Sequence, residues 1–302
     1  MVAPMFIFAA SAFVGPVQPI ASIPAVPRGA SPQASLQLVE YSAEVPYKEA
    51  QYDPVAADAF FRARPMAALR RLVQLTSTSS GFVFSLVLDK WLSREEQMAE
   101  RRSQELCDLV TKLGPAFIKI GQALSVRTDL LPAAYAQGLT RLQDSVPPFS
   151  AVQGRAVIEA ELGIVLSEVF SDISLEPIAS ASIGQVYKGT LRSTGEQVAV
   201  KVQRPDVLYD VSLDLFMLRS LAPSYQRATK ANTDLIGLVD AWGEGFINEL
   251  DYGKEAEATT AFSTAMSQRG LRSVTAPEVV PSLSSTHVLT TKWVDGERLA
   301  SS

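Results

Sequence analysis

The spacing of apolar residues changes once along the chain, near residue 165. From about residue 55 to 160, apolar side chains recur every three or four positions, which is typical of several amphipathic helices. One stripe continues across two segments and comprises Leu106, Leu109, Val110, Leu113, Phe117, Ile120 and Leu124. Gly114 and Pro115 interrupt it. Because proline lacks an N–H but suits the first turn of a helix, we expect a new helix to begin near Pro115.

Short β-prone runs follow Pro147, Pro148 and one further helix that holds Ile158, Leu162 and Leu166. The runs 175–178, 186–191 and 197–202 predict three antiparallel strands, and residues 193–195 supply a hairpin turn. Helical spacing returns from 235 to 246, and runs 276–280 and 287–294 predict two last strands. The pattern therefore predicts an α+β fold, with a helical first half and a small antiparallel sheet.

Composition excludes several classes of function. The chain is 47% hydrophobic, which is enough for a buried core, and its net charge of -5 gives no basic excess for binding nucleic acid. With one cysteine, Cys107, an intramolecular disulfide is impossible. Cys107 is predicted to be buried, and the one histidine, His287, is predicted to be structural at a strand end. We therefore expect no metal site and no Ser-His-Asp catalysis in this chain.

The first 40 residues have the composition of a targeting leader that is later cleaved. Residues 1–39 contain no Asp or Glu and one basic residue, Arg28, and they cannot bury a core. The string Ala10-Ser11-Ala12-Phe13 resembles the cleavage motif of leaders in algae with secondary red plastids. The predicted location is a plastid, with the mitochondrion as the alternative.

Candidate chemistry first occurs between the predicted strands. Small residues lie between the first two strands, and the third strand ends in Val198-Ala199-Val200-Lys201. This order is that of protein kinases, in which the loop covers nucleotide phosphates and the lysine pairs with them. Small side chains let backbone amides approach phosphate oxygens, and Ser182 adds a hydroxyl. The candidate nucleotide-contacting residues are Ala179, Ser180, Ala181, Ser182, Ile183, Gly184, Val186 and Lys201.

Two further strings carry a family resemblance. Lys119-Ile120-Gly121-Gln122 lies in a longer string from Lys112 to Pro132 that resembles the KxGQ signature of the UbiB (ADCK) family of atypical kinases. Lys119 and Gln122 are three residues apart and project to one side of a helix, whereas Ile120 and Leu124 are expected to face the core.

The resemblance also assigns roles in the second half. Glu249-Leu250-Asp251 resembles the ExD motif of the same family, and Glu255 is the glutamate expected to pair with Lys201. On a regular helix Asp251 and Glu255 would share a face and Glu249 would point elsewhere. Trp293 and Val294 resemble the hinge that binds adenine. Lys119, Gln122, Glu249 and Asp251 are expected to be regulatory, with Lys119 approaching one of the two motif carboxylates.

The resemblance implies three regions: the leader, a helical KxGQ extension at 50–165, and a protein-kinase-like N-lobe at 166–302 that ends at the hinge. We expect the C-lobe with its catalytic loop and DFG aspartate to be absent, so no residue of this chain is assigned a catalytic role. ATP is the expected cofactor, and Mg²⁺ is expected only with the missing lobe. The chain alone is then expected to turn over no ATP.

The family links such proteins to prenylquinone or isoprenoid lipid metabolism, so an isoprenoid lipid or a membrane surface are further expected partners. The alanine-rich loop and the long helical preface argue against an ordinary Ser/Thr kinase. A non-catalytic lipid- or partner-binding module with a degenerate kinase fold stays open as the alternative.

Overall fold

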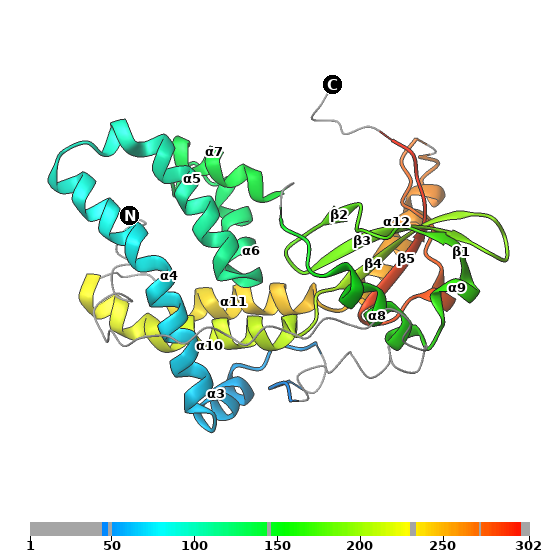
Figure 1. The fold of residues 1–302 in the computed structure, drawn as a ribbon, viewed down its shortest axis with the longest axis horizontal. Helices are drawn as coiled ribbons and strands as arrows, with labels where there is room; N and C mark the ends of the chain where they lie inside the picture. The colour runs from blue at the N-terminus through cyan, green and yellow to red at the C-terminus, as the bar shows by residue number, and fades with distance from the viewer. Residues whose placement is uncertain (1–43, 48–49, 144–145, 230–233, 272, 297–302) are drawn as a thin grey trace. The chain divides into compact units, whose positions relative to one another are not determined.

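The computed structural model describes residues 44–47, 50–143, 146–229, 234–271 and 273–296, so the predicted leader lies outside the described residues. The described chain forms two compact units. The helical unit consists of Glu44–Pro147 and Leu208–Glu244, and the sheet unit consists of Pro148–Val207 and the residues from Gly245 onward (Figure 1). Helices together with one antiparallel sheet confirm the predicted α+β class.

The helical unit is built around α5, which contacts α4, α6 and α7. Its elements are α3 (Pro54–Arg62), α4 (Pro65–Trp91), α5 (Glu95–Leu113), α6 (Pro115–Ser125), α7 (Ala133–Thr140), the 3-10 turn η1 (Arg141–Gln143), α10 (Val207–Thr229) and most of α11 (Leu235–Asn248). As predicted, α6 begins at Pro115. Gly114 precedes it with a φ of 105°, a value that favours glycine.

The predicted apolar stripe is confirmed on α5 and at Phe117, but it is wrong for Ile120 and Leu124 on α6. Leu106, Leu109, Val110 and Leu113 are all buried, as is Cys107. On α6, however, Ile120 and Leu124 are only half-buried. The buried face consists of Ala116, Phe117, Ile118, Gly121 and Ser125. The reason is the close approach at Gly121: a Cβ there would lie 2.5 Å from Leu142 Cδ1, so α6 turns its glycine face toward η1.

Two buried contacts join helices of this unit that are distant in sequence. Arg71 of α4 donates to both carboxylate oxygens of Asp214 on α10, at 2.6 and 2.8 Å. Phe61 of α3 packs against the α10 rings of Tyr209 and Phe216, with ring centroids 5.6 and 5.4 Å apart. These contacts attach α10 to the first helices of the chain. None of the helices within the described residues is long and apolar enough to cross a membrane.

The sheet unit contains one antiparallel sheet in the order β1-β3-β4-β5, with β2 pairing β3 beside this path. Its strands are β1 (Phe170–Ile173), β2 (Ala179–Ser180), β3 (Gly184–Leu191), β4 (Gln197–Gln203) and β5 (Val288–Lys292). The predicted strand 175–178 is wrong. Buried Phe170 pairs with Leu191 and begins β1 earlier, whereas Leu175 is 77% exposed. Run 276–280 contributes a single bridge, from Val279 to Thr291.

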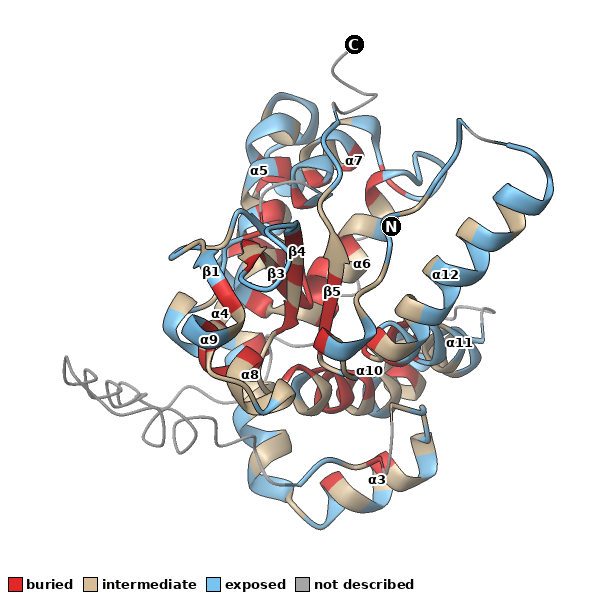
Figure 2. Ribbon diagram, turned by 90° about the vertical axis from the view of Figure 1, so that its right-hand side faces the viewer, coloured by how far each residue is buried: buried red, intermediate tan, exposed pale blue. Residues whose placement is uncertain are grey.

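Helix α8 (Ala151–Leu162) covers one face of this sheet and the short α9 (Leu166–Val169) leads into β1. The core between α8 and the sheet consists of buried side chains from Val157, Ile158, Leu166, Phe170, Tyr187, Leu191, Val198, Val200, Val202, Leu283 and Val288. Buried residues dominate β4 and β5 (Figure 2). Helix α12 (Tyr252–Gln268) contacts β5, and the 3-10 turn η2 (Pro281–Leu283) precedes that strand.

The compact units do not follow the linear division predicted at residue 165. The sheet unit begins at Pro148, and residues Leu208–Glu244 leave it between β4 and α12 to join the helical unit. The sequence pattern did not predict α10, a helix with Pro223 inside it. The region predicted to be the N-lobe is therefore interrupted by residues 208–244, which belong to the helical unit.

Candidate nucleotide-binding site

Strand alternation places Lys201 on the side of β4 opposite the core. Val198, Val200 and Val202 are fully buried and point toward α8, so the residues between them project from the other face. Lys201 lies directly across from Val186 on β3 and from Leu289 on β5. The lysine therefore occupies the middle of three paired strands.

The start of α12 brings Glu255 to this lysine. Asp251 caps the helix by accepting a hydrogen bond from the Gly253 N–H at 2.9 Å, and Glu255 lies in the first turn, where a negative charge is favoured. Lys201 Nζ donates to both oxygens of Glu255, at 2.8 and 2.6 Å. The predicted Lys201–Glu255 ion pair is thus present, with side chains that are 27% and 43% exposed.

Two hydrogen bonds fix the register between α12 and the sheet. The buried side chain of Gln203, at the end of β4, donates to the Leu250 carbonyl at 2.7 Å. The Tyr252 N–H donates to the Thr286 carbonyl, just before β5, at 2.9 Å. Sequence reasoning missed Gln203, although it lies two residues after Lys201 and strand alternation places both on one face.

Tyr252 is a second residue that sequence reasoning missed. Its ring is fully buried, and Lys201 Nζ lies 4.3 Å from the ring centroid, within the range of a cation–π contact. Burial, together with the Glu255 carboxylate, raises the pKa of the Tyr252 hydroxyl and keeps it protonated. The ammonium of Lys201 is therefore held between a carboxylate and the face of a neutral ring.

The small-residue loop is a tight hairpin tip. Ala179 and Ser180 form β2, and the Ala181 N–H donates to the Gly184 carbonyl at 2.8 Å. Ala179 and Ala181 are exposed, but Ser182 and Ile183 are buried. The main-chain N–H of Arg204, which directly follows β4, donates a hydrogen bond to the Ile183 carbonyl at 2.8 Å and keeps the tip close to the sheet. The predicted hydroxyl donor Ser182 is consequently not at the open surface.

Trp293 and Val294, the predicted hinge residues, directly follow β5. The Trp293 N–H donates to the Gln197 carbonyl at 2.9 Å, so this amide belongs to the sheet. The indole N–H donates to Asp295 at 2.7 Å, and Lys188 Nζ lies 4.2 Å from the ring. Val294 is 57% exposed. Backbone groups of Val294 and the Trp293 carbonyl are the remaining candidates for contact with a base.

The KxGQ residues have local roles within the helical unit. Gln122 donates to the Leu142 carbonyl at 2.8 Å and thereby ties α6 to η1, next to the close approach at Gly121. Lys119 is half-exposed on the same helix. Lys119 belongs to one compact unit whereas Glu249 and Asp251 belong to the other, so their approach stays a prediction.

The ExD string is not on a regular helix. Residues 249–251 form the break between α11 and α12, with Glu249 exposed, Leu250 buried and Asp251 acting as a cap. The predicted shared helical face of Asp251 and Glu255 is therefore wrong. Among the described residues, no group of three or more His, Cys, Asp and Glu side chains is placed to hold a metal ion.

His287 has the structural position predicted for it. Its Nδ1 lies 3.0 Å from Glu161 Oε2, which connects the residue before β5 to α8. The main-chain N–H of His287 donates to Ser285 Oγ at 3.2 Å.

Comparison with known proteins identifies relatives that match most of the chain. The model of the family described as "ABC1 atypical kinase-like domain" matches residues 141–302. An uncharacterised chloroplastic aarF domain-containing protein kinase of Arabidopsis thaliana is 39% identical over 262 residues, which are 87% of this chain and 38% of the relative. The chloroplastic protein "activity of bc1 complex kinase 3" of the same plant is 37% identical over 237 residues, 78% of this chain and 33% of the relative.

A solved structure, the erythromycin complex of a Mycobacterium tuberculosis protein, is 32% identical with a TM-score of 0.43, and the match covers 70% of this chain and 52% of that one. The chain thus spans less than two fifths of the length of the two plant relatives.

Proposed function

Because the chain belongs to the ABC1 atypical kinase-like family, also called the UbiB or ADCK family, we propose that its sheet unit is the ATP-binding portion of such a kinase or ATPase. The observation that carries the proposal is the Lys201–Glu255 pair at 2.8 and 2.6 Å on the face of the sheet opposite the core. In this proposal Lys201 reaches the α- and β-phosphates, and Glu255 orients it.

The chemistry of the lysine fits this role. An ammonium has three donors, and two are directed at Glu255, so one is left for a phosphate oxygen. Both side chains are partly exposed, which leaves the pair open to a ligand. Charge-assisted hydrogen bonds of this kind are about twice as strong as neutral ones. Lys201 would therefore contribute positioning and charge, and Glu255 would prevent the ammonium from swinging away.

The same face of the sheet can receive the base. Val186 and Ala199 are half-buried and share the face of Lys201, since Val186 is directly opposite the lysine and Ala199 precedes it by two residues. They give an apolar surface, and the Trp293 carbonyl and Val294 backbone lie at the strand end for polar contact with adenine. Ala179, Ser180, Ala181 and Gly184 border the phosphate side.

Mg²⁺ would neutralise phosphate charge during transfer. Glu255 is committed to Lys201, so in this proposal the metal ligands come from the part of the kinase that follows the hinge.

At the level of the whole protein, we propose an atypical kinase or ATPase of the plastid, linked to prenylquinone or isoprenoid lipid metabolism. The location is supported by the chloroplastic names of the relatives. Lys119, Gln122, Glu249 and Asp251 are proposed to regulate the nucleotide site, and an isoprenoid lipid or a membrane surface is the proposed partner.

A nucleotide titration of the 302-residue chain tests the assignment of Lys201. We expect Lys201→Met to weaken ATP binding by about 10-fold or more, because a charge-assisted hydrogen bond is lost. The matched control is Lys254→Met in the same unit, where the ammonium bonds Asn248 at 2.9 Å, and it should leave the affinity unchanged. Unchanged affinity in a folded Lys201→Met protein would contradict the proposal and favour the alternative of a non-catalytic partner-binding module.

A further inference from the structure

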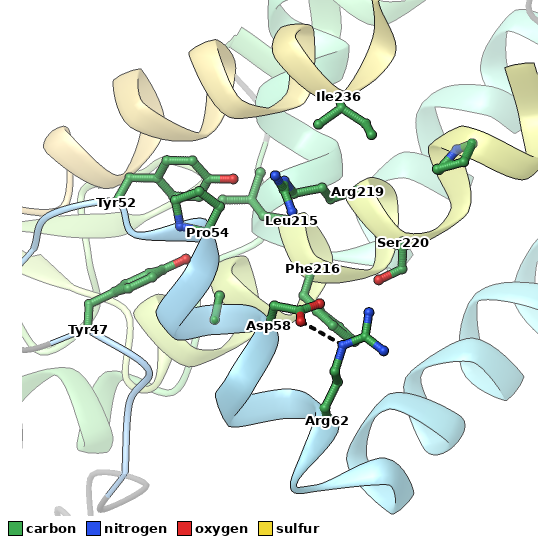
Figure 3. A pocket seen from close by; sticks show the side chains of 12 residues that line it. Tyr47, Tyr52, Pro54, Asp58, Arg62, Leu215, Phe216, Arg219, Ser220 and Ile236 are labelled. Carbon is green, nitrogen blue, oxygen red and sulfur yellow. Dashed lines mark hydrogen bonds and ion pairs between the residues drawn. The ribbon is translucent and has the colours of Figure 1, made fainter.

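A cavity of about 220 Å³ lies within the helical unit, between α3 and α10 (Figure 3). Its lining comes from the segment before α3, from α3 and α10, and from the second residue of α11. For comparison, a dry protein cavity of about 150 Å³ holds one benzene molecule. The space is therefore large enough for one ring with a small substituent.

Half of the residues that line the cavity are apolar. Ala57 is 3% exposed and Leu215 is 1% exposed, so both are fixed parts of the unit's core. The other apolar lining residues are Pro54, Phe216, Pro223 and Ile236. Such a wall favours a compact apolar body.

The charges at the cavity are already balanced. Arg62 Nε donates to Asp58 at 2.6 Å, as the dashed line in Figure 3 marks. Arg219 Nε donates to Asp240 at 2.9 Å, and the Tyr52 hydroxyl donates to the same carboxylate at 2.7 Å. Two cations thus face two anions in pairs, and a charged ligand would have to separate one of them. This arrangement favours a neutral ligand.

One polar group in the wall lacks a partner. Tyr47 is 4% exposed, and its hydroxyl is buried without a hydrogen bond. The neighbouring Ser212 side chain lowers the pKa of Tyr47, but it does not reach hydrogen-bond geometry with the Tyr47 hydroxyl, and it donates its own proton to the Leu208 carbonyl at 2.5 Å. Burial nevertheless raises the pKa of Tyr47 to about 12, so the hydroxyl keeps its proton at neutral pH. Figure 3 shows the hydroxyls of Tyr47 and Tyr52 directed toward the space between α3 and α10.

A buried hydroxyl without a partner is uncommon in a folded protein, because the donor loses water and gains nothing in return. We propose that this cavity is a binding site for a small neutral molecule with a ring-sized apolar body and one hydrogen-bond acceptor. The Tyr47 hydroxyl would donate its hydrogen bond to that acceptor. The site is independent of the proposed nucleotide site, since all its lining residues belong to the helical unit.

Three probe molecules of similar size test the chemistry in the 302-residue chain. Acetophenone carries a ring and a carbonyl acceptor, ethylbenzene lacks the acceptor, and benzoate carries a negative charge. Binding is measured by saturation-transfer NMR and by calorimetry. We expect acetophenone to bind about 10-fold more tightly than ethylbenzene, because a factor of this size is the usual net contribution of one hydrogen bond. Benzoate should bind most weakly.

The variant Tyr47→Phe keeps the ring and removes the hydroxyl. It should reduce acetophenone affinity to that of ethylbenzene and leave ethylbenzene binding unchanged, while Tyr135→Phe on α7, outside the cavity, should change neither. Without ligand, Tyr47→Phe should melt no lower than the wild type, because the lost group makes no hydrogen bond.

Three binding results would overturn the proposal. They are no binding of either neutral probe, a preference for benzoate, or acetophenone affinity that Tyr47→Phe leaves intact. A lower melting temperature for Tyr47→Phe in the absence of ligand would also do so, because it would mean that water or Ser212 already satisfies the hydroxyl.

Discussion

At the scale of single residues, the candidate site depends on Gly184 as much as on its charged pair. A Cβ at Gly184 would lie 2.5 Å from the Tyr252 hydroxyl and 2.5 Å from the Val202 carbonyl. The glycine therefore lets Tyr252 insert beneath β3, and Tyr252 in turn supports Lys201. Its role is to admit a neighbouring side chain as well as to keep the loop small.

We predict that Gly184→Ala lowers the free energy of unfolding by about 2 kcal/mol, within the range for overpacking a core, because one of the two clashing atoms is backbone. Urea denaturation followed by circular dichroism measures the change. Gly245→Ala in α11 is the control, since no atom lies within 4 Å of its added Cβ. A helical alanine there should be neutral or stabilising, and equal effects at both sites would contradict this reading of Gly184.

The residue-level predictions succeeded where a short string carried the information. Lys201 and Glu255 were paired from the order of the motifs, although 54 positions separate them. Tyr252 and Gln203 were missed because their roles depend on where α12 begins against the sheet. Nothing in the string 179–184 indicates that Ser182 is buried while Ala181 is exposed, since this follows from hydrogen bonds to Gly184 and Arg204.

At the scale of elements, the attachment of α4 to α10 rests on Arg71. Its guanidinium binds Asp214, whose side chain is fully buried, and also donates to the Leu113 carbonyl at the end of α5 at 2.6 Å. One side chain thus connects three helices. Removing the Arg71 guanidinium would leave the buried Asp214 carboxylate without its cation.

Arg71→Met is predicted to destabilise the chain by about 3 kcal/mol, because removing one partner of a buried ion pair is strongly unfavourable. The neighbouring exposed Arg70 offers a matched control, and Arg70→Met should change the free energy of unfolding by less than about 0.5 kcal/mol. Chemical denaturation of both variants at pH 7 measures this difference. Two similar values would show that the Arg71–Asp214 contact does not support the unit.

The same contact predicts a pH dependence. Burial, with a smaller contribution from Asp210, raises the pKa of Asp214 from 3.8 to about 6 against the opposing effect of Arg71. The folded chain then binds a proton more readily than the unfolded chain. The stabilisation is fully present below the unfolded pKa and is lost as the pH rises through about 6.

We therefore expect the denaturant concentration at the unfolding midpoint of the wild type, measured relative to that of Asp214→Asn, to decrease as the pH is raised from 4 to 7. Denaturation of the two proteins at four pH values gives this difference. The contribution of the other carboxylates is common to both proteins and drops out of the difference. A difference that rises with pH would mean that Arg71 outweighs burial.

Element boundaries were predictable where proline or an unbroken stripe marked them. Pro115 marks the start of α6, and the apolar stripe of α5 is buried as predicted. The strand predicted at 175–178 failed because β propensity alone does not say which run is buried; Phe170 fills the core and Leu175 does not. Long α10 was missed because its apolar positions give no single narrow face and Pro223 interrupts the pattern.

At the scale of the whole molecule, neither compact unit is a continuous segment. The chain leaves the sheet unit after β4, adds α10 and most of α11 to the helical unit, and returns to place α12 against β5. A linear reading of motifs gives the order of the parts, but it cannot predict this interleaving, because packing depends on contacts such as that of Arg71 with Asp214. The ion pair of Lys201 and Glu255 forms across the insertion.

The central claim is that Lys201 lies at the phosphates of a bound nucleotide, and affinity labelling tests it most directly. An acyl-phosphate derivative of ATP transfers its acyl group to a lysine amine near the phosphates, and peptide mass spectrometry identifies the modified residue. The account predicts that Lys201 is acylated in the 302-residue chain and that excess ATP prevents it, while Lys188 and Lys254 react to the same small extent with and without ATP. Labelling of Lys201 that ATP does not reduce, or ATP-protected labelling at another lysine in its place, would contradict the account.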